Sequence, residues 1–147
     1  MSGKFKLQTV LKYRKTLEEQ AQQRLAEILG VESGLRIKQG EINGHLEALT
    51  AQLLQKQRQG LPILELRLYE DQIDHHRQQK EHLLQQLEEI KCLVNERRQE
   101  LLVAARERKI LETLKEKQLA EYLRKLDRKE RIMLDEISLQ QQKRGAE

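Results

Sequence analysis

The chain has 147 residues, of which 35% are charged and only 3% aromatic, and it contains no tryptophan. Such a composition excludes a thick globular core, and its abundance of Leu, Glu, Lys, Arg and Gln is typical of long helices and coiled coils. The formal net charge of +4 is small beside 28 basic and 24 acidic residues. Weakly paired charges on solvated helix faces explain this balance better than a surface for polyanions does.

The sequence carries few signals that would direct the protein to a particular cellular compartment. A single cysteine, Cys92, cannot form an intrachain disulfide. Met1–Lys4 show neither a secretory leader nor a myristoylation motif. No apolar run approaches the ~18 residues that a membrane span needs. The sequence therefore predicts a cytoplasmic protein that does not insert into a membrane.

A first helix is predicted over about residues 5–58. Apolar residues recur there at steps of three, four or their sums, as in a coiled-coil seam: Leu7, Val10, Leu17, Ala21, Ile28, Val31, Leu35, Ile42, Leu49 and Leu53. Further leucines flank this series: Leu11, Leu25, Leu29 and Leu46. Four glycines, Gly30, Gly34, Gly40 and Gly44, each weaken the helix by about 1 kcal/mol relative to alanine. They are either tolerated soft spots or mark a bend or close approach where a partner docks.

A turn is predicted over residues 59–62. Gly60 has a low helix propensity, and Leu61 is biased away from helix by the proline that follows it. Pro62, the only proline in the chain, lacks a backbone donor but suits the start of a new helix.

A second helix is predicted over about residues 63–140. Its apolar series is Leu66, Tyr69, Ile73, Leu83, Leu87, Ile90, Val94, Leu101, Ala104, Leu111 and Leu114, and the polar residues His76, Lys80, Arg97 and Arg108 interrupt it. Polar residues at seam positions lower stability but help to fix register.

Both seams are too narrow to be buried against anything but another helix. We therefore predict an all-α fold in which residues 1–147 form one long antiparallel two-helix coiled-coil hairpin, with the C-terminal helix longer than the N-terminal one. A residue n then faces roughly residue 123 − n, and the chain past about residue 118 has no internal partner. That part still carries an apolar stripe, which predicts an external partner: Leu119, Tyr122, Leu126, Met133 or Leu134, and Ile137.

Motifs for chemistry are absent from the sequence. It has no phosphate-binding loop and no His-Glu-x-x-His motif, and the spacing of His75, His76 and His82 does not place two ligands on one helix face. A two-helix rod also has no concave pocket for catalysis. We expect no catalytic residues, no cofactor, no metal and no enzymatic activity.

The densest basic stretch, Arg124–Arg131, is interrupted by Asp127 and Glu130. Contact with DNA phosphates demands a region nearly free of acids, and single strands require aromatic residues for stacking. Nucleic acid is therefore not an expected partner.

Both ends of the chain resemble the FliJ family of flagellar export proteins. The resemblance lies in Phe5–Arg14 (FKLQTVLKYR) with Glu18 following, and in Leu101–Lys117 (LLVAARERKILETLKEK), Tyr122–Glu130 (YLRKLDRKE) and Leu134–Ile137 (LDEI). It implies an antiparallel coiled coil that resembles the central stalk of rotary ATPases. The end carrying both termini is then expected to insert into the hexameric export ATPase and activate it. The body is expected to contact the cytoplasmic domain of the export gate and to escort export chaperones, at the inner face of the cell membrane.

The resemblance also implies site residues. The ATPase-facing set is Arg14, Arg106, Lys109, Lys115, Tyr122, Arg128, Leu134, Asp135 and Glu136. The gate-facing set lies nearer the turn and comprises Ile42, His45, Leu49, Tyr69, Ile73 and His76. Two alternatives stay open: a stalk protein of an injectisome-type secretion system, and a scaffold coiled coil that acts by self-association.

Overall fold

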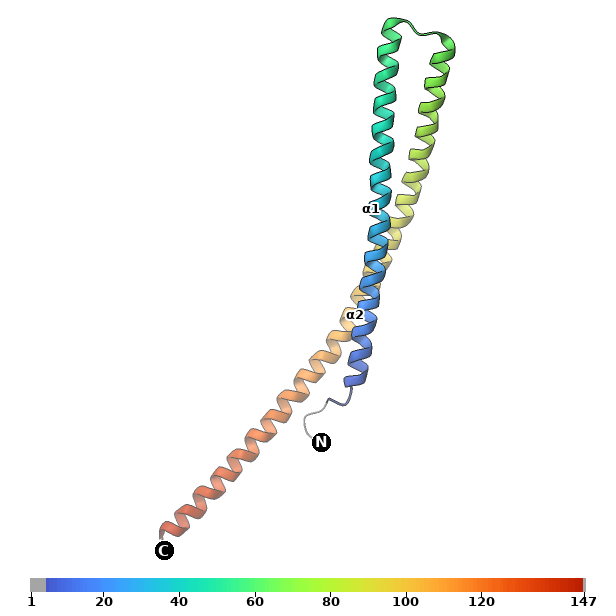
Figure 1. Ribbon diagram of the computed structural model, residues 1–147. Helices are drawn as coiled ribbons and strands as arrows, with labels where there is room; N and C mark the ends of the chain where they lie inside the picture. The colour runs from blue at the N-terminus through green and yellow to red at the C-terminus, as the bar shows by residue number, and fades with distance from the viewer. Residues whose placement is uncertain (1–4, 147) are drawn as a thin grey trace. The chain divides into compact units, whose positions relative to one another are not determined.

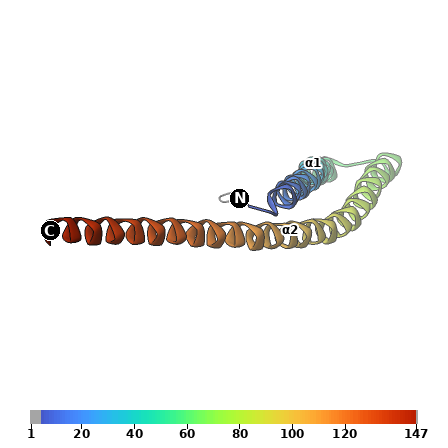
Figure 2. The same ribbon diagram turned by 90° about the horizontal axis from the view of Figure 1, so that it is seen from below.

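The computed structural model describes residues 5–146, which form two α-helices (Figure 1). Helix α1 spans Gln8–Gln59, and helix α2 spans Ile63–Ala146. The ribbon of α2 runs without interruption in Figures 1 and 2. The all-α class, the packing of the two helices as a hairpin and the greater length of the second helix are confirmed. In the described part of the chain, neither helix is long and apolar enough to cross a membrane.

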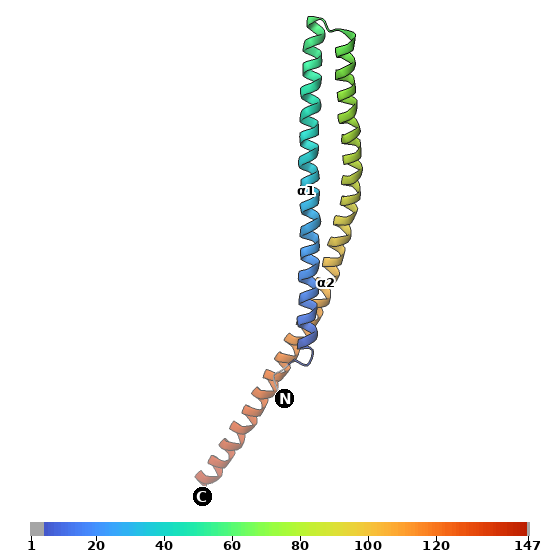
Figure 3. The ribbon, with the colours of Figure 1, turned by 45° about the vertical axis from the view of Figure 1, so that its right-hand side comes forward.

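The chain divides into two compact parts. One comprises Ala21–Leu101 and contains the turn; it is called the turn unit here. The other, the terminal unit, combines the described residues of Met1–Gln20 with those of Leu102–Glu147. In the turn unit α1 and α2 lie side by side in both side views (Figures 1 and 3).

The turn forms where the sequence predicts it. Gly60 has a φ of 92°, a left-handed conformation in which a side chain would clash with the backbone. Its N–H lies 3.4 Å from the carbonyl oxygen of Gln57, which closes the end of α1. Pro62 stands directly before α2, and its carbonyl accepts a hydrogen bond of 3.1 Å from the N–H of Leu66. Pro62 therefore starts the second helix without costing it a backbone hydrogen bond.

The seam of α2 follows the predicted series. Ile73, Leu83 and Val94 are buried, and the polar seam residue His76 is half-buried in the same phase. Leu114 is the exception among the predicted residues, because it is 44% exposed. The three- and four-residue spacing of the α2 seam therefore continues through its polar positions.

Three residues of the apolar series predicted for the first helix do not lie in its seam. Leu7, Val10 and Val31 are 41%, 40% and 48% exposed, so their assignment to the seam is wrong. The less exposed residues alternate at steps of three and four along one line, the α1 seam: Leu11, Arg14, Glu18, Ala21, Leu25, Ile28, Glu32, Leu35, Gln39, Ile42, Leu46, Leu49 and Leu53. The prediction from apolar residues alone missed this line because charged residues occupy several positions of the α1 seam.

Contacts across the turn unit set the register of the hairpin. Arg24 lies 3.7 Å from Glu100. The rings of His45 and His76 stack with their centroids 5.6 Å apart. Lys56 Nζ stands 5.2 Å from the centroid of the Tyr69 ring. These contacts agree with the predicted pairing of residue n with a residue near 123 − n.

The four glycines of α1 are not explained by packing. A Cβ atom added at Gly30, Gly34, Gly40 or Gly44 would meet no atom within 4 Å. No close approach by another described part of this chain therefore requires a glycine at any of these positions.

Replacing Gly60 tests the turn. Gly60→Ala should lower the free energy of unfolding by about 1–2 kcal/mol, because an L-residue is strained at positive φ. Gly60→Asn is the matched control and should cost less, since asparagine tolerates the left-handed region better than other residues with a Cβ. Urea unfolding followed by far-UV circular dichroism measures both. Equal stability of Gly60→Ala and the parent chain would contradict the turn geometry.

Candidate protein-binding surface of the terminal unit

The paired part of the terminal unit is held by one apolar anchor and a set of ion pairs. Leu11 of α1 is 1% exposed and is the most buried large side chain among the described residues. On α2, Ala104 and Leu111 are half-buried. Their spacing of seven residues places them on one helix face, as a seam requires.

Charged residues continue this seam. Arg14 donates to the carboxylate of Glu107. Arg108 donates to Glu18 across the helices and to Glu112 on its own helix. The hydrogen bond from Arg108 to Glu18 is the main cause that raises the pKa of Arg108. Because the guanidinium groups of Arg14 and Arg108 stay charged, their ion pairs hold α1 and α2 together at seam positions that are otherwise apolar.

Beyond this network α2 loses its apolar cover. Lys15 reaches Glu112 at 3.8 Å, and cross-helix ion pairs of the described residues extend no further along α2. The large apolar residues that follow are all at least 40% exposed except Tyr122, which is half-buried: Leu119, Leu123, Leu126, Ile132, Met133, Leu134, Ile137 and Leu139. Apart from Tyr122, the predicted stripe is therefore present and uncovered.

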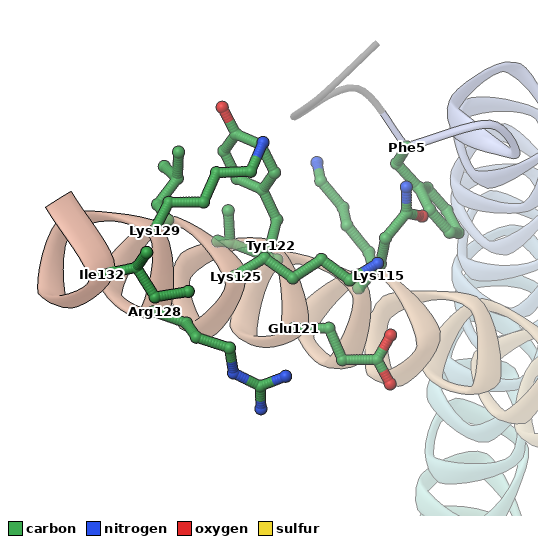
Figure 4. A pocket seen from close by; sticks show the side chains of 11 residues that line it. Phe5, Lys115, Glu121, Tyr122, Lys125, Arg128, Lys129 and Ile132 are labelled. Carbon is green, nitrogen blue, oxygen red and sulfur yellow. The ribbon is translucent and has the colours of Figure 1, made fainter. Parts of the chain in front are cut away.

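A groove opens where this exposed part of α2 begins (Figure 4). Its volume is about 490 Å³, and Phe5, ahead of α1, forms one end of it. The lining combines an apolar floor with four basic side chains and one acid: Phe5, Leu119, Tyr122, Leu126 and Ile132, with Lys115, Lys125, Arg128, Lys129 and Glu121, together with Gln118. Figure 4 shows Tyr122 and Lys129 on the side of α2 towards Phe5, whereas Arg128 and Glu121 point away from it.

The apolar stripe is rotated relative to the seam. The steps that carry the α2 seam through Arg108 and Leu111 continue to a lysine-rich line: Lys115, Gln118, Tyr122, Lys125 and Lys129. The uncovered apolar residues Leu119, Leu123 and Leu126 each follow that line by one residue, which is about 100° around a helix. The apolar face of this part of α2 therefore points in a different direction from the face that packs against α1.

The structure places the predicted ATPase-facing residues in three settings. Arg14 is engaged in its ion pair, while Arg106 and Lys109 are exposed on the paired part of α2. Lys115, Tyr122 and Arg128 are brought together by the groove. Leu134, Asp135 and Glu136 are exposed beyond it.

The sequence prediction missed several groove residues: Phe5, Lys125, Lys129 and Ile132. The helical spacing of Lys125, Lys129 and Ile132 relative to Tyr122 was the signal that pointed to them. No such signal existed for Phe5, because it lies ahead of α1 and reaches the groove only in the folded chain.

The comparison with protein families bears on the whole chain. The family model of the flagellar FliJ protein matches residues 3–147. The chain belongs to the FliJ family. The resemblance seen in the sequence is thereby confirmed, and FliJ proteins are non-enzymatic components of flagellar protein export. Neither the curated proteins nor the solved structures yielded a match. Within residues 5–146, no group of three or more His, Cys, Asp or Glu side chains is arranged to hold a metal ion.

The predicted gate-facing residues of this FliJ chain lie mostly in the seam of the turn unit. Ile73 is 8% exposed. His45 is exposed and stacks on the half-buried His76. The other three are half-buried as well: Ile42, Leu49 and Tyr69. Within this set, His45 offers the most accessible surface to a partner.

A charge exchange tests the ion pair of Arg14 in this FliJ chain. Arg14→Glu alone should lower the midpoint of urea unfolding, because it sets two carboxylates against each other. Arg14→Glu combined with Glu107→Arg should recover most of that loss, since the pair is restored with its charges reversed. As a control, Arg131→Gln removes an exposed ion pair within α2 and should leave the midpoint nearly unchanged. A double variant no more stable than Arg14→Glu would show that the pair does not tie the helices together.

Proposed function

We propose that this chain is the stalk of the flagellar export ATPase: the terminal unit inserts into the hexameric ring and promotes its assembly and ATP hydrolysis. The observation that carries the proposal is the long uncovered part of α2, with its apolar stripe from Leu119 to Ile137. An exposed amphipathic helix face of this length marks a site for a protein partner. The charged rim of the groove adds polar contacts that orient that partner.

Activation does not require a catalytic residue from the stalk. A stalk that binds the conformations of a ring unequally shifts their populations by its difference in affinity for them. The stripe and the lysine-rich line through Lys115, Lys125 and Lys129 lie about 100° apart around one helix, so neighbouring subunits of a surrounding ring meet different chemistry. Such asymmetry provides the unequal binding that the mechanism needs.

Contact with the export gate and escort of export chaperones belong to the same proposal and fall to the turn unit. His45 supports a gate contact because it is exposed on α1 while its ring stacks on His76 of α2. These partners place the protein in the cytoplasm, held at the inner face of the cell membrane through the export apparatus.

The alternatives are less well supported. The match to the flagellar family favours flagellar export over an injectisome-type system. The same match favours an export component over a scaffold that acts by self-association.

Truncation after residue 118 tests the ATPase role. The shortened chain should lose the activation of a purified export ATPase while its urea unfolding midpoint changes little, because the removed residues do not contribute to the seam. Truncation after residue 139 is the matched control; it keeps the whole stripe and should activate normally. Full activation by the chain that ends at residue 118 would refute the proposed insertion.

The gate contact has a separate test. His45→Ala should weaken binding to the purified cytoplasmic domain of the gate about tenfold, as expected for an interface residue worth about 1.4 kcal/mol. His82→Ala, at another exposed position of the turn unit, is the control. Both variants should still activate the ATPase. Equal gate binding by both variants would remove His45 from the proposed surface.

A further inference from the structure

The glycine segment, residues 30–44 of α1, lacks the features that hold its neighbours in place. Its four glycines are exposed, and no neighbouring atom lies within 4 Å of where their Cβ atoms would be. They therefore weaken the helix without any gain in packing against the described part of the chain. No other described helical residue is a glycine except Gly145, which lies in the last turn of α2.

The α1 seam is also partly polar here. Glu32 and Gln39 take two of the four α1 seam positions within the glycine segment. On either side of the segment the seam is apolar, with Leu25 and Ile28 before it and Leu46 after it. Two half-buried polar side chains in place of leucines remove part of the stabilisation that the pairing of the helices provides.

A small groove opens on the surface at this level. It has a volume of about 220 Å³ and lies between α1 and α2. Its lining is mostly polar or charged: Glu32, Arg36 and Gln39 of α1, with Leu84, Leu87, Glu88 and Lys91 of α2. Arg36 pairs at 3.1 Å with Glu32 of the same helix, so this ion pair does not tie α1 to α2.

The firm contacts lie on both sides of the segment. Among the described residues of the turn unit, the ion pair of Arg24 with Glu100 precedes it, and the stacked rings of His45 and His76 follow it. The α2 residue Leu83, by contrast, is 4% exposed and depends on α1 for its cover.

We infer that the glycine segment is a site of local opening, where α1 unwinds and parts from α2 while the hairpin on both sides stays paired. Segments with few buried contacts and weak helix propensity open with a smaller free energy than the whole molecule. Opening uncovers the seam of α2 at Leu83 and Leu87 without undoing the turn. The inference goes beyond the proposed export function, because it concerns the chain alone and needs no partner.

Hydrogen exchange of the full chain, followed by NMR at single amides, tests the inference. Protection factors at Glu32, Leu35 and Gln39 should be at least tenfold lower than those at Leu46 and Leu49. Protection factors, rather than raw rates, remove the faster intrinsic exchange near glycine. Equal protection in the two stretches would overturn the proposal.

A variant with all four glycines replaced (G30A, G34A, G40A and G44A) tests the cause. Each replacement should raise protection in the segment about fivefold, the factor implied by the propensity difference between glycine and alanine, and the four together on the order of several hundredfold. Gly145→Ala is the matched control and should leave the segment unchanged. The converse variant, Ala51→Gly, should lower protection around residue 51 and not in the segment.

A failure of the fourfold variant to slow exchange would overturn the role of the glycines. The truncation tests of ATPase activation do not involve this segment. Failure of the local-opening inference and failure of the proposed export function are therefore distinguishable.

Discussion

Every feature of this molecule depends on the burial of a narrow seam between two helices. Only five residues are buried among the apolar residues described: Leu11, Ala21, Ile73, Leu83 and Val94. A chain with so little bulky apolar volume gains stability only if each helix covers the stripe of the other. The seam therefore determines the antiparallel pairing, and with it the position of every exposed face.

The unequal lengths of α1 and α2 leave part of α2 free to bind a partner. Beyond the end of the shorter α1, the remaining part of α2 has an apolar face but no helix to cover it. The change of direction between the lysine-rich line through Lys125 and the stripe through Leu126 shows that this face is not a failed continuation of the hairpin. It is suited to a different partner, in keeping with a FliJ protein that acts by binding and carries out no chemistry of its own.

Polar residues in the seam have opposite consequences in the two units. In the terminal unit, Arg14 and Arg108 each find a carboxylate on the facing helix, so polarity there fixes the register. In the turn unit, Glu32 pairs only within its own helix, and Gln39 lines a groove. The same substitution of polar for apolar residues thus strengthens the specificity of pairing in one place and loosens it in another.

The sequence by itself determined the helical class, the turn at Gly60–Pro62, the pairing near 123 − n and the stripe beyond residue 118. These features follow from local propensity and from the spacing of apolar residues, which are written in the chain. Tertiary structure alone decided that Leu11, and not Val10, lies in the seam, because that choice depends on which residues find partners on α2. It likewise decided that Phe5 reaches the groove near Tyr122, since the two are far apart in sequence and meet only when the helices pair.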